Sequence, residues 1–365
     1  MLSNASAAHE QEFSGEYSFR IDIALHKLSK LARTSALLAG AGLILSGCGP
    51  GAPPSGSAHG ITVCLVTTSQ GVNDHGFNQL ALQGAQSTGA TVRVIPSRTP
   101  DDYLPNLQKC AQTDLTVAVS SQMANPVWHA ATQHVERRFL LVDAEPMDDL
   151  QATQHLVNVE SLFFKAQEAG YLVGALTGLL EQQKVGAASH NVAGILGTNH
   201  RPVVDAYIAG FIAGARSVDP TIKFQLTYSD SDDVAACKQI GISQIAKSAD
   251  VLFEVTGRCA AGYIDAAYDA AAYAIGSDTD LAYLSPAVIT SGLKRVDHVV
   301  ALAIGDLQDG NFKSGAQVYS LKDDAIGYST PSSVVPQGII NQLMDIRDKI
   351  RSGSIVPPDT IPPGV

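Results

Sequence analysis

The sequence lacks a hydrophobic run long enough to cross a membrane. Its best candidate, residues 35–46, has 12 residues, whereas a transmembrane helix needs roughly 20. An excess of basic residues is also missing, because 24 Lys and Arg stand against 35 Asp and Glu, for a net charge of -11. Broad nucleic-acid binding relies on Lys and Arg to neutralise phosphates. We therefore expect no nucleic-acid partner.

Motifs of the common enzyme classes are absent as well. The sequence contains no GxSxG elbow, phosphate-binding loop, HExxH or GxGxxG pattern. Its ten histidines are scattered, and none pairs with a Cys or Glu cluster at metal-ligand spacing. Asp230, Asp232 and Asp233 lack the glycine and distal glutamate of an EF-hand loop, which favours a solvated turn. The sequence therefore predicts no enzymatic activity, no metal and no cofactor; an activity as a hydrolase would depend on these acids alone.

The first 60 residues have the pattern of an export signal followed by a tether. Lys27, Lys30 and Arg33 precede the apolar run, which ends in the sequence Leu-Ser-Gly before Cys48. This order is typical of bacterial lipoproteins, in which the cysteine is acylated and becomes the new N-terminus. Residues 1–47 are thus a predicted signal peptide, and the Gly/Pro/Ser-rich residues 48–60 a flexible tether. We expect an exported chain anchored to a bacterial membrane by lipid on Cys48, since two acyl chains suffice for stable anchoring; a buried cysteine in an ordinary helix is the alternative.

Four further cysteines allow two disulfides in an exported chain. Pairing within each half of the body would join Cys64 to Cys110 and Cys237 to Cys259. Buried free thiols are the alternative.

The body alternates apolar, β-branched runs with segments of helical periodicity. The predicted strands cover residues 61–66, 91–95, 115–119, 139–143, 191–196, 223–228, 251–255, 272–276 and 317–321. The predicted helices cover residues 77–88, 104–111, 125–135, 164–182, 202–217, 234–248, 262–270, 288–307 and 335–352. This alternation indicates an α/β fold with mostly parallel sheets flanked by helices. Because the rhythm restarts in the middle of the chain, we expect two lobes, with a ligand beyond the carboxyl ends of their strands.

Five segments, in order along the chain, resemble the basic membrane protein family of solute-binding lipoproteins. They are VTTSQGVNDHGFN at residues 66–78, FLLVD at 139–143, EAGYLVG at 168–174, YAIGSDTD at 273–280 and TSGLKRVD at 290–297. The resemblance covers about residues 60 to 350. It implies a periplasmic-binding-protein fold of type I that binds a nucleoside or purine-like ligand and delivers it to the permease of an ABC importer.

The resemblance also implies that the chain crosses between the lobes three times. We place the N-terminal lobe at residues 61–158 and 286–314, the C-terminal lobe at residues 159–285 and 315–330, and a C-terminal helix with a proline-rich tail at residues 331–365. A ligand sensor that signals to a membrane partner is the first alternative function, and a nucleoside-processing hydrolase the second.

Candidate ligand-binding residues follow from the matched segments and from their position after predicted strands. By the resemblance, Phe77 stacks on a base, Asp278 accepts hydrogen bonds from ribose hydroxyls and Lys294 contacts the sugar. The remaining candidates are polar or small residues at strand ends: Thr68, Asn73, Asp74, Asn78, Asp143 and Gly257.

Each of these residues also has a structural interpretation. Phe77 could belong to the core, Asp74 could cap a helix, and Lys294 could be a solvated charge on a helix. Asp278 could cap a helix or lie in a surface turn, and Asp143 could cap a helix or stabilise a hinge.

The chain departs from the family at two positions that affect the ligand. Thr68 replaces an aspartate that reads the purine, and residues 229–233 contain no aromatic residue where a second stacking partner is expected. A different polar ligand is therefore an alternative to a purine nucleoside.

Overall fold

The computed structural model describes residues 60–364. Cys48, the predicted signal peptide 1–47 and all of the tether except its last residue lie outside this range. Within it, no helix combines the length and the apolar composition required to span a bilayer.

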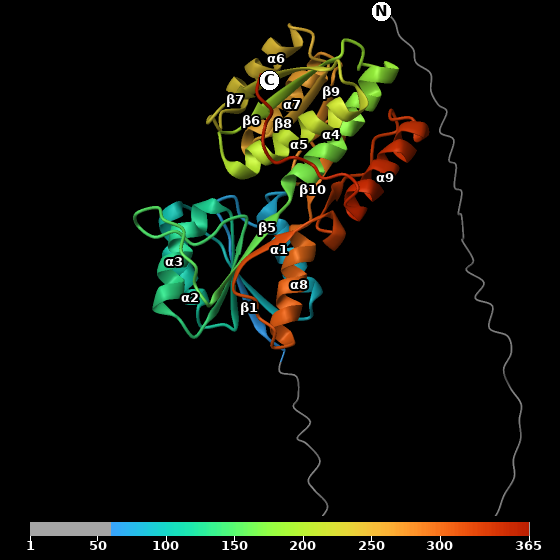
Figure 1. Ribbon diagram of the computed structural model, residues 1–365. Helices are drawn as coiled ribbons and strands as arrows, with labels where there is room; N and C mark the ends of the chain where they lie inside the picture. The colour runs from blue at the N-terminus through green and yellow to red at the C-terminus, as the bar shows by residue number, and fades with distance from the viewer. Residues whose placement is uncertain (1–59, 365) are drawn as a thin grey trace, which may run out of the picture. The chain divides into compact units, whose positions relative to one another are not determined.

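The first sheet has six parallel strands in the order β11-β5-β4-β3-β1-β2. Figure 1 shows helices on both of its faces, α1 and α8 on one and α2 and α3 on the other. Its strands are β1 (Thr62–Val66), β2 (Thr91–Ile95), β3 (Leu115–Val119), β4 (Arg138–Val142), β5 (Val159–Phe164) and β11 (Gly315–Tyr319). Its helices are α1 (Phe77–Ser87), η1 (Pro100–Asp102), α2 (Tyr103–Cys110), η2 (Ser121–Met123), α3 (Ala124–Gln133) and α8 (Val296–Gln308). We call this unit the first lobe.

The second sheet has the order β12-β10-β9-β8-β6-β7, and all its pairs except β10–β12 are parallel. Its strands are β6 (Val192–Gly197), β7 (Lys223–Tyr228), β8 (Val251–Val255), β9 (Tyr273–Gly276), β10 (Val288–Lys294) and β12 (Ile326–Tyr328). Its helices are α4 (Ala166–Gln183), α5 (Pro202–Val218), α6 (Val234–Ile245), η3 (Gly257–Cys259), α7 (Ala260–Asp269), η4 (Leu321–Asp323) and α9 (Gln337–Ser352). This second lobe completes the predicted two-lobed α/β architecture.

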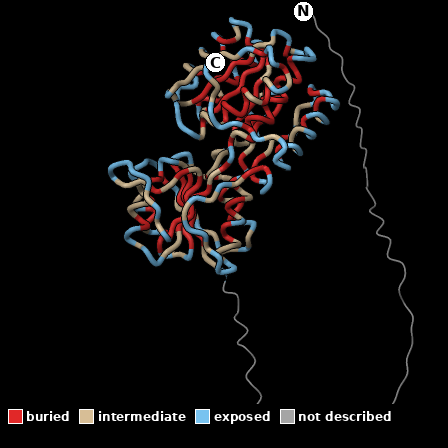
Figure 2. Tube along the Cα trace, in the orientation of Figure 1, coloured by how far each residue is buried: buried red, intermediate tan, exposed pale blue. Residues whose placement is uncertain are grey.

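Successive side chains of a strand point to opposite faces of its sheet, so these apolar strands place apolar side chains on both faces. In β1, for example, Val63 and Leu65 join the core shared with α4 and α5, while Cys64 and Val66 join the core under α2 and α3. A third core lies between the second sheet and helices α6 and α7. The buried segments in Figure 2 accordingly run through the middle of both lobes.

The strands are divided between the lobes differently from the sequence prediction. β5 and β11 belong to the first sheet, although residues 159–285 and 315–330 were assigned to the C-terminal lobe. β10 belongs to the second sheet, although residues 286–314 were assigned to the N-terminal lobe. The predicted crossings near residues 158, 286 and 315 are therefore misplaced, because each crossing follows the carboxyl end of a strand instead of preceding the strand. They lie at Lys165, Arg295 and Ser320.

Strands β5, β10 and β12 were not predicted. Residues 288–294 form strand β10 and not the first turns of a helix, since α8 begins only at Val296. β5 was missed because the polar Glu160 and Ser161 interrupt its apolar pattern, although both side chains are buried. Arg295 separates β10 from α8. Because this residue is neither Gly nor Pro, the local sequence does not mark the change from strand to helix.

The structure pairs Cys64 with Cys110 and Cys237 with Cys259, as predicted. The first bridge joins β1 to the end of α2, and the second joins α6 to η3. The segment closed by the second bridge contains β8 and the turn that follows it. By limiting the unfolded chain, each bridge contributes roughly 3–4 kcal/mol of stability.

Helices α4 and α5 pack with their backbones in close approach. A Cβ atom added at Gly170, Gly174 or Gly178 would overlap the backbone of α5 at Tyr207, Phe211 or Ala215. These glycines therefore allow an approach that no larger residue would permit. The contact fixes α5, which carries Tyr207 of the candidate site described next.

Candidate functional site

The Lys294 ammonium group connects the carboxyl ends of the two sheets. Lys294 ends β10 in the second lobe, and its Nζ lies 2.9 Å from Oδ2 of Asp143, which follows β4 in the first lobe. The same Nζ lies 3.2 Å from Oδ1 of Asp278, which follows β9. The Lys294 side chain is only 3% exposed, so the interpretation as a solvated helix charge was wrong.

Both aspartates have an unusual backbone conformation. The φ angle is 61° at Asp143 and 65° at Asp278, in the left-handed region that costs energy for residues other than glycine. The Asp278 carbonyl accepts a hydrogen bond from the Lys294 backbone at 2.9 Å, and the Asp143 N–H donates to the Leu162 carbonyl at 2.8 Å. Neighbouring strands thus hold both carboxylates at the lobe boundary. Such strain is common at functional sites.

The cluster carries two acids and one base. Burial alone would lower the pKa of Lys294, but the carboxylates of Asp143 and Asp278 outweigh burial and raise it above its usual value. Burial raises the pKa of Asp278, and the Lys294 ammonium opposes that shift. Two acceptors in the cluster are buried without a hydrogen-bond partner, Oδ1 of Asp143 and Oδ1 of Asp278, and the second lies 3.2 Å from Lys294 Nζ. The site can therefore accept a hydrogen bond from a bound molecule.

Two aromatic rings border this cluster. Lys294 Nζ lies 5.6 Å from the ring centroid of Phe77, at the start of α1, and 5.9 Å from that of Tyr207. Both distances are in the range of a cation–π contact. Phe77 packs against the core as well, in agreement with its structural interpretation. Tyr207 was not predicted as a site residue, because it lies in the interior of a strongly apolar helix.

Thr68, Asp74 and Asn78 form one hydrogen-bonded group after β1. The Asp74 carboxylate accepts from the backbone N–H groups of Gly76, Asn78 and Gln79, which confirms its capping role at the start of α1. The Asn78 side chain donates to both Thr68 and Asp74 and accepts from the Thr68 backbone. Asn78 is buried, so this group holds the loop that carries Phe77.

The other two candidates are exposed. Asn73 lies in the loop before α1, and Gly257 begins η3 with a φ angle of 73°. No atom comes within 4 Å of a Cβ placed on Gly257, so its freedom serves the backbone turn and not a close approach within the protein.

Two more contacts join the lobes. Arg201, before α5, donates to Oγ of Ser121 at 3.0 Å. The rings of His75 and Tyr283 stack with centroids 4.3 Å apart, one in the loop before α1 and the other in the loop after β9. Sequence patterns gave no sign of either contact, because both join loops of different lobes.

A cavity of about 1150 Å³ lies where β5 passes into α4. Its lining includes Tyr228 at the end of β7. The Tyr228 ring lies against the His200 ring with centroids 3.8 Å apart and planes tilted by 35°, and the Tyr228 hydroxyl lies 2.5 Å from the Asp205 carboxylate. Tyr228 thus places an aromatic ring directly before residues 229–233, where the sequence contains no aromatic residue. The tail residues Asp359, Thr360 and Ile361 line the same cavity.

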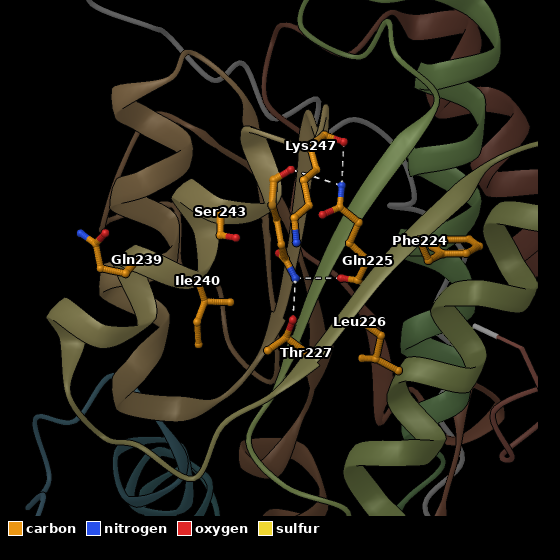
Figure 3. A pocket seen from close by; sticks show the side chains of 9 residues that line it. Phe224, Gln225, Leu226, Thr227, Gln239, Ile240, Ser243 and Lys247 are labelled. Atoms are coloured by element: carbon orange, nitrogen blue, oxygen red, sulfur yellow. Dashed lines mark hydrogen bonds between the residues drawn. The ribbon is translucent and has the colours of Figure 1, made fainter.

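A further pocket, of about 580 Å³, lies against edge strand β7 and helix α6 (Figure 3). Gln225 donates to the carbonyls of Gln244 and Lys247. Gln244 donates in turn to Gln225 and Thr227 of β7. These amides serve the fold, and none of the predicted site residues lines this pocket.

Residues 61–360 match the family described as "ABC transporter substrate-binding protein PnrA-like". Among curated proteins, the chain is 27% identical to the "CD4+ T-cell-stimulating antigen" of Listeria monocytogenes, over 91% of this chain and 99% of that protein. It is 26% identical to the "ABC transporter nucleoside-binding protein BmpA" of Lactococcus lactis, over 79% and 87% of the two chains. An "uncharacterized lipoprotein" of Pyrococcus abyssi is also 26% identical, over 78% and 73%.

Solved structures share the fold. An ABC transporter solute-binding protein of Aeropyrum pernix K1 is 24% identical and superposes with a TM-score of 0.67, over 82% of this chain and 94% of that chain. A second solute-binding protein, from Conexibacter woesei, is 20% identical with the same TM-score, over 83% of this chain and all of the other.

Proposed function

The chain belongs to the Bmp family of PnrA-like ABC transporter substrate-binding proteins, and from this premise we propose that it binds a nucleoside-like molecule between its lobes. The ligand would contact Phe77 and Asp143 of the first lobe and Asp278 and Lys294 of the second. The observation that carries the proposal is the convergence of both lobes on the Lys294 ammonium, beside the unpartnered Asp143 Oδ1.

The chemistry of the cluster favours a ligand rich in hydrogen-bond donors. Two carboxylates and one ammonium leave a net negative charge, and a carboxylate binds a diol through charge-assisted hydrogen bonds. The Phe77 ring supplies an apolar surface beside these charges, and an aromatic ring can stack on a base. A nucleoside combines a diol with a base. Ribose hydroxyls on Asp278 and a base N–H on Asp143 would use both carboxylates.

Transport follows from a shift between open and closed lobes. A ligand that bridges the lobes favours the closed form by its differential affinity for that form. The crossings at Lys165, Arg295 and Ser320 are the segments about which the lobes would move. The closed protein would then deliver its ligand to an ABC permease.

A thermal-shift screen over nucleosides, bases, sugars and amino acids tests the ligand class, with calorimetry for each compound that stabilises the protein. We expect nucleosides to raise the melting temperature, because a ligand that binds only the folded state stabilises it. Stabilisation by sugars or amino acids alone would contradict the proposal.

Phe77→Ala is expected to weaken binding of the selected nucleoside by roughly 1–3 kcal/mol, the usual value of stacking on a base. Phe312→Ala is the matched control, because Phe312 is a partly buried ring of the first lobe that contacts Arg138 and not the site. Calorimetry at one temperature measures both variants. Equal affinities for the two would remove Phe77 from the binding site.

We further propose that the mature chain begins at an acylated Cys48. The order of basic residues, apolar run and Leu-Ser-Gly-Cys supports this proposal. The intact mass of the membrane-extracted protein should equal residues 48–365 plus lipid, and Cys48→Ser should abolish the lipid mass. A Cys48→Ser protein that keeps the same added mass would show that the lipid is attached elsewhere.

A further inference from the structure

Glu254 is a buried acid next to the proposed ligand site. It is the penultimate residue of β8, it is 1% exposed, and neither the family resemblance nor the sequence patterns marked it. Among the described ion pairs none includes Glu254, so hydrogen bonds alone compensate its charge. Burial of a carboxylate costs free energy. We therefore looked for a role of Glu254 among its hydrogen-bond partners.

Its four hydrogen bonds form two pairs. Oε2 accepts from the N–H and the hydroxyl of Thr256, at 2.9 and 2.7 Å. Oε1 accepts from the N–H and the hydroxyl of Ser277, at 2.9 and 3.2 Å. One carboxylate thus joins the loop after β8 to the loop after β9.

Each of these loops continues into a proposed ligand-binding residue. Thr256 precedes Gly257, and Ser277 precedes Asp278, and both following residues have a positive φ angle. The Asp278 N–H donates to the Tyr207 hydroxyl at 3.5 Å, and the Asp278 carbonyl accepts from the Lys294 N–H at 2.9 Å. The strained turn at Asp278 is therefore held at its N–H and at its carbonyl, and Glu254 holds the residue directly before it.

We infer that Glu254 is a positioning residue of the binding site, which sets the Asp278 carboxylate and the Gly257 backbone at the geometry that the ligand requires. This inference rests on the proposed function, because it assigns Glu254 to the same site without contact to the ligand.

The arrangement depends on the ionised form of Glu254. Burial raises its pKa to about 7, and the hydrogen bonds from Thr256 and Ser277 oppose that shift. A protonated carboxyl can no longer accept all four hydrogen bonds, so protonation must release or reorient one donor. We therefore expect affinity to be full above about pH 7 and to fall as the pH decreases through that value.

Other groups near Glu254 do not account for this pH dependence. The charges that interact with it are those of Asp278, Tyr207, Tyr263 and Tyr283. The pKa values of the three tyrosines are raised by burial, so they stay neutral near pH 7. Burial also raises the pKa of Asp278, but Glu254→Gln keeps Asp278, so a pH dependence of affinity that Asp278 causes would persist in that variant.

Glu254→Gln tests the inference, with Glu160→Gln as control. Glu160 is also a buried glutamate with a pKa raised to about 7 by burial, but it lies on β5 in the other lobe. Calorimetry with the nucleoside selected by the screen is run over a pH range centred on about 7. In Glu254→Gln the dissociation constant should rise about tenfold at the alkaline end and lose its pH dependence. In Glu160→Gln both properties should remain those of the wild type.

A folded Glu254→Gln protein with wild-type affinity and wild-type pH dependence would overturn the inference. An equal loss of affinity in Glu254→Gln and Glu160→Gln would overturn it as well. If Glu254→Gln does not fold, Thr256→Val and Ser277→Ala replace it, because each removes one hydroxyl donor to Glu254. Each should weaken binding several-fold, and unchanged affinity in both would overturn the inference. A wild-type protein that binds no nucleoside would instead contradict the proposed function, and the two failures are thereby distinguished.

Discussion

Replacement of Lys294 by methionine is expected to lower the free energy of unfolding by about 3–5 kcal/mol. Methionine is apolar and of similar length, so the substitution removes the charge with little change in packing. It leaves Asp143, whose side chain is 10% exposed, without its cation. Breaking a buried pair on one side costs more than the pair contributes, because the remaining charge stays desolvated.

Urea denaturation of the apo protein measures this loss. Lys322→Met is the control, since Lys322 is exposed and takes part in none of the described ion pairs. The unfolding free energy of Lys322→Met should stay within about 0.5 kcal/mol of the wild type. The double variant Lys294→Met with Asp143→Asn should recover part of the loss, because it removes both charges. Equal stability of Lys294→Met and Lys322→Met would show that the ammonium is not buried in solution.

Asp278→Asn is expected to weaken nucleoside binding by about 1.5–3 kcal/mol, or roughly 10- to 150-fold in Kd. Asparagine has the shape of aspartate and tolerates the left-handed backbone at this position, so the variant keeps the turn. Its amide nitrogen replaces one acceptor oxygen with a donor, which opposes the ligand hydroxyls. The charge-assisted part of the hydrogen bond is lost as well.

Asp280→Asn provides the control for this variant. Asp280 is exposed two residues further on, where its side chain accepts a hydrogen bond from the backbone of Ala282, a role that asparagine can also fill. Calorimetry should give wild-type affinity for Asp280→Asn and much weaker binding for Asp278→Asn. Similar affinities for the two variants would place Asp278 outside the ligand contacts.

Several parts of the fold were predictable because they depend on local pattern. The short apolar runs at β1, β3 and β8 are buried at nearly every residue, as expected for strands covered on both faces. Both cysteine pairs were predictable as pairs within one half of the chain. Lys294 shows where such reasoning fails: its segment is apolar and β-branched before an amphipathic helix, and periodicity over so few residues does not separate strand from helix.

Candidate residues were identified by the resemblance, but their partners were not. The sequence favoured Asp143, Asp278 and Lys294 singly, each with an alternative role. It contained nothing to indicate that Tyr207 and Glu254 support them, because a tyrosine in an apolar helix and a glutamate in a buried strand match no ligand-binding motif. Both are recognised only by what lies beside them.

The amino-acid sequence by itself determined the two-lobed α/β architecture and the set of strand-end residues, since these follow from periodicity and from short matched segments, and it favoured the cysteine pairing that the structure shows. Only the tertiary structure decided that Lys294 meets Asp143, 151 residues away along the chain, and that β5, β10 and β11 complete their sheets before the chain crosses. The physical reason is that pairing of strands and contact between lobes depend on long-range packing, which a local sequence pattern does not encode.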